Sequence, residues 1–367
     1  MRKIFLCMLL VLLFLNVKAF AQYKVAQLDE GTGQKITEIF EFSNIDIDVI
    51  DFINKITSGN FDFKSFFSLE KIANLFGYEF KNIFKFISPV FVVVMLSALI
   101  NNADATLGKI SISNIAVTAT VVLSLINITY DVIEYTITAT DKLVMFVNAL
   151  LPILLTLVFS AGKMGTSAVL NPLILYISAI ITLLVKDIII PFVLMSLAVN
   201  LSGEVLEKPH LVNLGEQITK ILKWVIGIIF TVYIGVVGII GVVAPKVDDI
   251  TLKTTKYAVS TFIPYVGGMV AESVELVLEC SAILKNAVGI AGLLGVISIV
   301  GIPCISIAVR FIVVNIFSFV VAPVSGKSVI NSINHVASCL GVIWSMNVVV
   351  AVVYIIFITV IIFVGGA

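Results

Sequence analysis

The sequence predicts an all-α, polytopic integral membrane protein with about seven or eight transmembrane helices, preceded by a signal peptide and short amphipathic helices. The chain is 60% hydrophobic and only 13% charged, whereas soluble domains have about 45–50% apolar and about 25% charged residues. Its mean hydropathy is +1.15. From residue 86 onward, apolar runs of near-spanning length follow one another with short polar breaks between them.

Residues 1–21 have the three-part form of a secretory signal peptide. Arg2 and Lys3 supply the positive start, an apolar stretch follows, and Ala19-Phe20-Ala21 fits a cleavage site. The apolar stretch is short for the roughly 20 residues that a crossing needs, so cleavage is favoured over an uncleaved first span. The mature N-terminus is then expected on the outer face of the membrane.

Residues 22–86 differ in composition from the rest and are expected to form an extracytoplasmic amphipathic-helical region. Acidic and aromatic residues alternate here, and apolar residues such as Leu69, Ile72 and Phe76 recur at helical spacing. This pattern predicts short helices that lie against the membrane or against another protein. The remainder, 87–367, is expected to be the polytopic membrane domain.

The membrane domain is predicted to consist of successive apolar helices. The run at 169–201 is too long for one ordinary span and is interrupted at Lys186, Asp187 and Pro191. It is either one long broken helix or two short helices that turn at Lys186, so the topology beyond that residue and the side of the C-terminus stay open. The expected runs are 86–100, 112–133, 143–160, 169–201, 224–244, 287–309, 311–322 and 340–364.

Polar breaks and small residues predict how these runs are joined and packed. The net acidic segment 131–142 is expected to be an outer loop, and Arg310 is expected to mark a membrane boundary by snorkelling. Small residues at intervals of four predict close helix contacts on two faces, one with Gly227 and Gly235 and one within 287–295.

The candidate functional residues are charged groups beside or within the apolar runs. Read as a helix after the break at Pro264, Gly267 and Gly268, the next segment places three carboxylates on one stripe, because their spacing is i, i+3 and i+7. This stripe is either a solvated face of an extramembrane helix or a surface that meets water or a partner. Lys186 and Asp187 form either an ordinary turn or the tip of a re-entrant pair. The candidate water- or partner-facing residues are Glu272, Glu275, Glu279, Lys186 and Asp187.

Composition and motifs exclude most other chemistry. With 23 basic and 23 acidic residues, the chain is not expected to bind nucleic acid. No two of the four cysteines have CxxC spacing. Cys7 lies in the expected signal peptide, and the other three are interpreted as small buried hydrophobes. His210 and His335 lack ligand-like neighbours, and no phosphate-binding or nucleophile motif fits. We expect no catalytic residue, no metal and no cofactor. A membrane protease that uses Asp131 and Asp187 ranks last, since both lie at expected span ends or breaks.

Two blocks carry a resemblance to a known family. The first reads LLPILLTLVFSAGKMGTSAVLNPLILY at 150–176, and the second, at 251–292, contains KYAVSTFIPYVGGM and LKNAVGIAG. Both blocks, and their order after a signal peptide and a short outer region, resemble the stage III sporulation protein AE family over roughly 87–367. The resemblance implies a protein of endospore-forming bacteria, in the mother-cell membrane around the forespore. It would be a subunit of a trans-envelope channel complex that supports forespore development.

These observations leave alternative functions. The favoured one is a non-enzymatic membrane subunit of that sporulation complex, with other membrane subunits and the lipid bilayer as partners. The alternative is a stand-alone secondary transporter or permease of an unknown small solute, which would use the broken helices near Lys186, Pro191 and Pro264. Stoichiometry and any transported molecule do not follow from the sequence.

Overall fold

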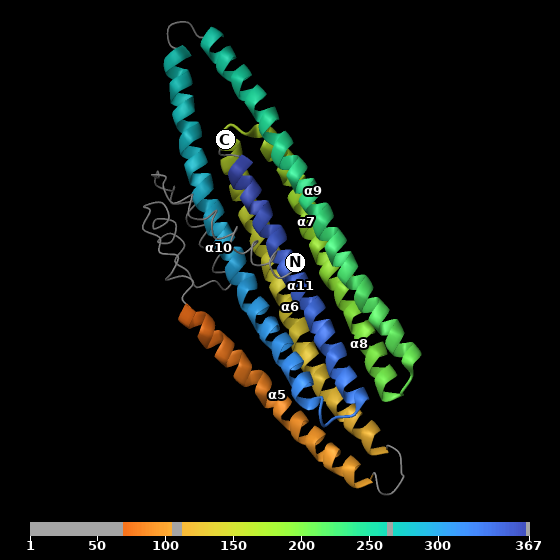
Figure 1. Ribbon diagram of the computed structural model, residues 1–367. Coiled ribbons are helices and arrows are strands. Elements are labelled where there is room, and N and C mark those ends of the chain that lie inside the picture. Colours follow the sequence, from red (N-terminus) through yellow and green to blue (C-terminus); the bar gives the residue numbers. More distant parts are fainter. Residues whose placement is uncertain (1–68, 105–111, 263–266, 365–367) are drawn as a thin grey trace.

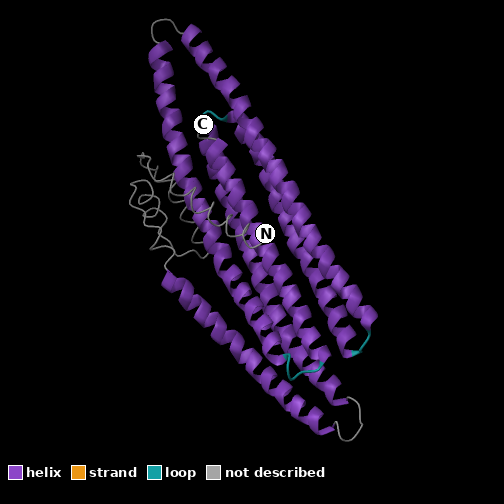
Figure 2. Cartoon of the chain, in the orientation of Figure 1, coloured by secondary structure: helices purple, strands orange, loops and turns teal. Residues whose placement is uncertain are grey.

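The computed structural model describes residues 69–104, 112–262 and 267–364. Each element in these ranges is a helix, so the predicted all-α class is confirmed (Figures 1 and 2). The helices run side by side in an elongated bundle (Figure 1). The expected signal peptide and most of the expected outer region, residues 22–68, lie outside the described residues.

The bundle is built from unusually long helices. With a rise of about 1.5 Å per residue, a helix as long as α6 extends about 74 Å, more than twice the roughly 30 Å of bilayer hydrocarbon. The longest helices therefore extend beyond the hydrocarbon of any membrane they cross. The elements are α5 (Leu69–Asp104), α6 (Ile112–Ser160), α7 (Met164–Thr182), the π-helix η1 (Leu183–Ile189), α8 (Ile190–Val205), α9 (Pro209–Phe262), α10 (Gly267–Val321) and α11 (Lys327–Val364).

The described helices include 5 candidate membrane spans, selected by length and apolar composition. This number is lower than the sequence-based count because two pairs of expected runs are each joined in one helix, α6 and α10, and because the expected run 86–100 of α5 is not among the candidate spans. The expected loop at 131–142 is wrong: α6 continues through it. In the same way α10 continues through Arg310, so the expected runs 287–309 and 311–322 form one helix, and the membrane boundary expected at Arg310 stays a prediction. The spans are Val117–Ser160, Leu175–Val205, Pro209–Ile239, Val288–Val321 and Lys327–Phe363.

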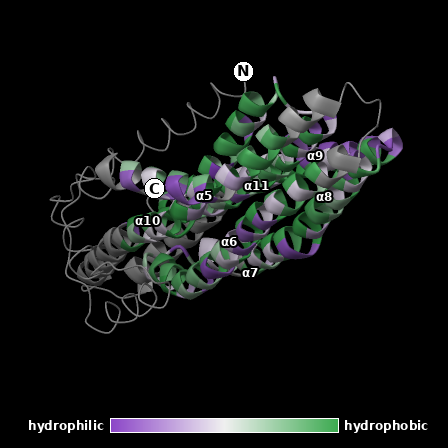
Figure 3. Ribbon diagram, turned by 90° about the horizontal axis from the view of Figure 1, so that it is seen from below, coloured by the Kyte–Doolittle hydropathy of each residue, from purple (hydrophilic) through white to green (hydrophobic). Residues whose placement is uncertain are grey.

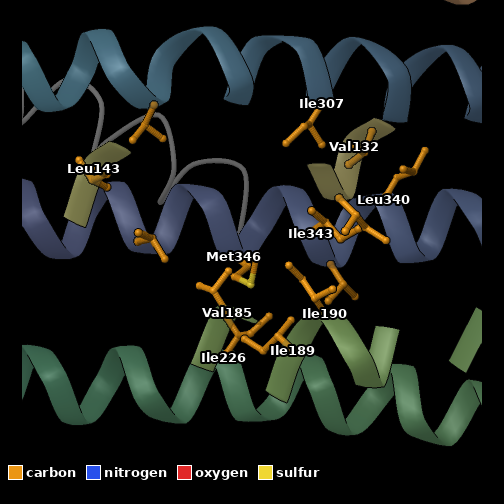
Figure 4. Packing of buried hydrophobic residues seen from close by; sticks show 14 of the residues in the cluster. Val132, Leu143, Val185, Ile189, Ile190, Ile226, Ile307, Leu340, Ile343 and Met346 are labelled. Atoms are coloured by element: carbon orange, nitrogen blue, oxygen red, sulfur yellow. The ribbon is translucent and has the colours of Figure 1, made fainter. Parts of the chain in front are cut away.

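Apolar packing places α11 at the centre of the bundle. It contacts α6, α8, α9 and α10, and 61% of the apolar window in its span is buried. Figure 4 shows Met346 and Ile343 of α11 between Ile307 of α10 and the side chains Val185 and Ile189. Hydrophobic residues dominate the described helices, and hydrophilic ones interrupt them locally (Figure 3). Because most of the bundle is apolar, the polar side chains inside it are the candidates for specific contacts between helices.

Only one of the two predicted small-residue contacts forms. A Cβ on Gly295 of α10 would clash with the ring of Phe146 in α6, and Ala291 is fully buried. A Cβ added at Gly227 or Gly235 of α9 would instead have no atom of another helix within 4 Å. The spacing of small residues alone does not reveal whether a second helix lies against them.

Two helix ends share one backbone motif but differ in the residue at its critical position. After α6, Lys163 N–H bonds to Val158 C=O at 3.2 Å, and Gly162 has a φ of 78°. After α8, Lys208 N–H bonds to Gly203 C=O at 2.8 Å, but the left-handed position is Glu207 with a φ of 53°. Glycine adopts this conformation without steric cost, whereas glutamate does not.

Replacing Glu207 by glycine is therefore expected to stabilise the protein by about 1 kcal/mol, since a left-handed residue with a Cβ costs roughly 1–2 kcal/mol. Glu207 is exposed, so no packing is lost. The measurement is the midpoint of unfolding in detergent micelles. Gly162→Ala is the matched control and should lower the midpoint; an equal change in both variants would contradict the assignment.

Candidate functional site

The most distinctive charged contact joins the middle of α6 to the π-helix η1. Lys186 Nζ forms an ion pair and hydrogen bond with Asp141 Oδ1. The Lys186 side chain is 28% exposed and that of Asp141 is 45% exposed. Both residues lie in helices that are candidate membrane spans, where an unpaired charge is costly. In this contact the positive charge of Lys186 and the negative charge of Asp141 compensate each other.

The local backbone around Lys186 follows from Pro191. Proline has no N–H, and its ring collides with the carbonyl four residues earlier in a regular α-helix. Here the turn before it widens: Ile190 N–H bonds to the carbonyl of Val185, five residues back. Helix therefore continues from Met164 to Val205 through η1, which is the long broken helix of the two alternatives. Such π segments frequently occur at functional sites.

The ion pair can be tested by a double-mutant cycle. We expect Lys186→Gln and Asp141→Asn each to destabilise the protein in micelles. The double variant should be more stable than the sum of the single effects predicts, with a coupling of about 0.5–3 kcal/mol. Asp187, adjacent and exposed, supplies the control: Asp187→Asn combined with Asp141→Asn should be additive. Additivity in both cycles would contradict the pair.

A second charged contact fastens α5 to the rest of the bundle. Arg310 Nη2 of α10 lies 3.6 Å from Glu79 Oε2 of α5, and its guanidinium carbon lies 4.9 Å from the centre of the Tyr135 ring in α6. Both charged side chains are less than one-tenth exposed. One arginine therefore ties three helices together through an ion pair and a cation–π contact.

A third contact lies near the C-terminal end of α8. His335 Nε2 of α11 is 3.4 Å from Glu204 Oε1, and both residues are buried. In α8 one turn away, buried Asn200 donates to Ser196 Oγ at 3.3 Å. Ser196 in turn lies 2.6 Å from Thr219 Oγ1 of α9. Hydrogen-bonded side chains thus connect α8 to α9, and an ionisable pair connects it to α11.

Neutral side chains link the central helix to α6 and α7. Tyr354 OH of α11 donates to Ser178 Oγ at 3.3 Å, and Ser178 donates to Asn148 Oδ1 at 2.9 Å. Asn347 donates to Thr136 Oγ1 at 3.0 Å. Interhelical hydrogen bonds of this kind are a normal means of orienting helices in membranes, each worth about 0.6–2 kcal/mol.

The structure separates the predicted site residues rather than gathering them. Lys186 is half-buried and paired, whereas Asp187 next to it is exposed. The three glutamates at 272, 275 and 279 lie in the first part of α10, which begins at Gly267 as the break predicts. Their side chains are outside the described part, so their exposure to water or a partner stays a prediction. Asp141 and Glu79 were not singled out from the sequence.

The long apolar helices, with charged side chains paired between them, define a multi-pass helical membrane protein. The chain belongs to the stage III sporulation protein AE family, whose members match residues 47–365. The protein called stage III sporulation protein AE of Bacillus subtilis (strain 168) is 26% identical over 313 residues, which cover 83% of this chain and 77% of that protein. No solved structure matches the chain.

This family match confirms the resemblance on the two quoted blocks and extends it. The similarity begins at residue 47, well before the expected start near 87. It includes all of α5, which runs through the expected boundary between 86 and 87. Glu79, which binds Arg310, therefore lies within the family region.

Proposed function

We propose that this chain is a non-enzymatic integral membrane subunit of a trans-envelope channel complex between mother cell and forespore. It would lie in the mother-cell membrane around the forespore and be needed for forespore development. The observation that carries the proposal is the family match over 47–365, in a chain with 5 candidate spans. Its role would be to pack helices and recruit neighbouring membrane subunits rather than to catalyse a reaction.

The proposal is tested in the spore-forming source organism. Deletion of the chain should leave engulfment complete and block later forespore gene expression, read with a fluorescent reporter under a late forespore promoter. A tagged functional copy, solubilised from sporulating membranes, should co-purify with other membrane proteins made at the same stage. Normal reporter activity in the deletion strain would overturn the proposal.

The three glutamates of α10 are the proposed water- or partner-facing surface. Their spacing of i, i+3 and i+7 places Glu272, Glu275 and Glu279 on one stripe of the helix. A Glu272→Gln, Glu275→Gln, Glu279→Gln variant should reduce co-purification of the other subunits and lower spore yield. If this variant assembles and sporulates normally, the stripe is only a solvated face.

A stand-alone transporter is the second candidate function, favoured by one observation. The π-helix at Leu183–Ile189 interrupts a candidate span at a charged pair, Lys186 with Asp141, as broken helices do in secondary transporters. Purified protein in proteoliposomes should then move a solute without other subunits, and Lys186→Gln should abolish the flux. If no ion or small solute of a broad panel is transported, the stand-alone transporter is contradicted and the function as a subunit of a membrane complex is favoured.

A further inference from the structure

Two lysines on α5 and two acidic residues on α6 are left without an ion pair among the described residues. Lys81 and Lys85 are exposed on α5, whereas Asp131 is half-buried and Glu134 is exposed on α6. The ion pairs of the described residues do not include any of the four. Uncompensated charges are costly beside apolar spans and are usually paired or hydrated there. The two sets are opposite in sign and each contains two charges.

The positions of these charges along the bundle are fixed by Arg310. Its side chain contacts both Glu79 of α5, at 3.6 Å, and the ring of Tyr135 of α6, at 4.9 Å, so these two residues lie at one level. The helices α5 and α6 run in opposite directions and are joined at one end of the bundle (Figure 1).

Both charge sets lie on the same side of the Arg310 level. At about 1.5 Å per residue, Lys81 and Lys85 lie about 3 Å and about 9 Å beyond Glu79. By the same rise, Glu134 and Asp131 lie about 1.5 Å and about 6 Å from Tyr135. Because α5 and α6 are antiparallel, both directions lead toward their connection (Figure 1). The lysines and the acids therefore lie at matching heights.

The exposed surface around these charges is aromatic. The rings of Phe80 and Phe84 are stacked with centres 6.2 Å apart, and they line a shallow, open depression on α5 together with Lys81, Lys85, Ser88 and Pro89. On α6, Tyr130 beside Asp131 is 66% exposed. Aromatic residues contribute much of the contact energy in protein interfaces. The exposed surface of α5 thus combines two lysines with stacked aromatic rings, and that of α6 combines two acidic residues with an exposed tyrosine ring.

We propose that this α5–α6 face binds a second copy of the chain, related by a two-fold axis parallel to the bundle. Because α5 and α6 pack against each other, their exposed faces adjoin. Rotation about such an axis brings α5 of one copy opposite α6 of the other and keeps every residue at its height. Lys81 and Lys85 then meet Asp131 and Glu134 of the other copy, twice in the dimer.

Two features favour a second copy over another partner. The lysines are four residues apart and the acids three, which corresponds to about 6 Å and about 4.5 Å along the helices, so both pairs engage together. An axis along the bundle also leaves both copies in the same orientation in the membrane. This inference goes beyond the proposed function and holds for either candidate function.

Charge reversal tests the dimer directly. Variant A carries Lys81→Glu and Lys85→Glu; variant B carries Asp131→Lys and Glu134→Lys. Each alone places like charges across the interface, which costs several kcal/mol, so self-association of differently tagged copies should fall more than about tenfold. Co-expressed A and B place opposite charges at both contacts, and their mixed dimer should co-purify like the wild type. Lys220→Glu with Lys223→Glu, on exposed positions of α9, is the control and should change nothing.

Cysteine cross-linking in native membranes covers the case in which a reversed variant fails to fold. Two differently tagged chains, one with Lys81→Cys and one with Glu134→Cys, at matching heights in the proposed dimer, should form a disulfide-linked pair under mild oxidation. Cross-linked species larger than a dimer, from a chain that carries both cysteines, would overturn the two-fold arrangement.

Three further results of these experiments would contradict the dimer. Folded A and B that do not associate with each other would overturn the dimer. The dimer would also be overturned if the wild type is a monomer that binds anionic lipid and variant A no longer binds it. The same holds if the wild-type monomer binds another subunit that variant A or variant B no longer binds, because the face would then be the site for that other ligand.

Discussion

Replacing Arg310 by methionine is expected to destabilise the protein by about 3–5 kcal/mol, because a buried carboxylate is left without its counter-charge. Arg310 and Glu79 have side chains only 9% and 7% exposed, so solvent compensates little of the loss. The cation–π contact to Tyr135 disappears as well. The measurement is the unfolding midpoint of the purified protein in micelles, followed by the fluorescence of Trp224 and Trp344.

A second variant separates the loss of the ion pair from simple loss of packing. Adding Glu79→Gln to Arg310→Met removes the unpaired charge, so the double variant should regain much of the stability. Lys220→Met is the control, since the Lys220 side chain is 63% exposed and a surface change of this kind is usually within about 0.5 kcal/mol. A double variant less stable than Arg310→Met alone would show that the buried carboxylate is not the cause.

Local sequence patterns were sufficient for the helical class and for the start of one helix. Long apolar runs predict helices regardless of what they pack against, and the break at Pro264 and Gly267-Gly268 correctly predicts where α10 begins. The helical form of the segment with Glu272 follows from the same reasoning. Each of these features depends on residues close together in the chain.

The charged contacts required information that the local sequence does not hold. Lys186 and Asp141 are 45 residues apart, and nothing in the spacing of either indicates the other. Charges at 131–142 and at Arg310 predicted breaks, yet the helices continue because charged side chains do not disrupt backbone hydrogen bonds. Arg310 and Asp141 instead meet side chains of neighbouring helices. The partner of a charge depends on helix packing, which one sequence does not reveal.

Replacing Gly295 by alanine is expected to destabilise the protein by about 1–3 kcal/mol, the usual cost of overpacking a close-packed core. The added methyl group would collide with the ring of Phe146, which is fully buried in α6. Neither group can move easily, since α6 and α10 are both central helices with extensive contact. The variant is measured by its unfolding midpoint in micelles and by resistance to limited proteolysis.

The same helix contains a matched control for this prediction. At Gly301 of α10, an added methyl group would have no other side chain within 4 Å, so Gly301→Ala should gain up to about 1 kcal/mol from helix propensity alone. Phe146→Leu vacates space beside Gly295, so Gly295→Ala should cost less in that background than in the wild type. An equal cost in both backgrounds, or a loss at Gly301 as large as at Gly295, would mean that the α6–α10 contact does not limit the size of residue 295.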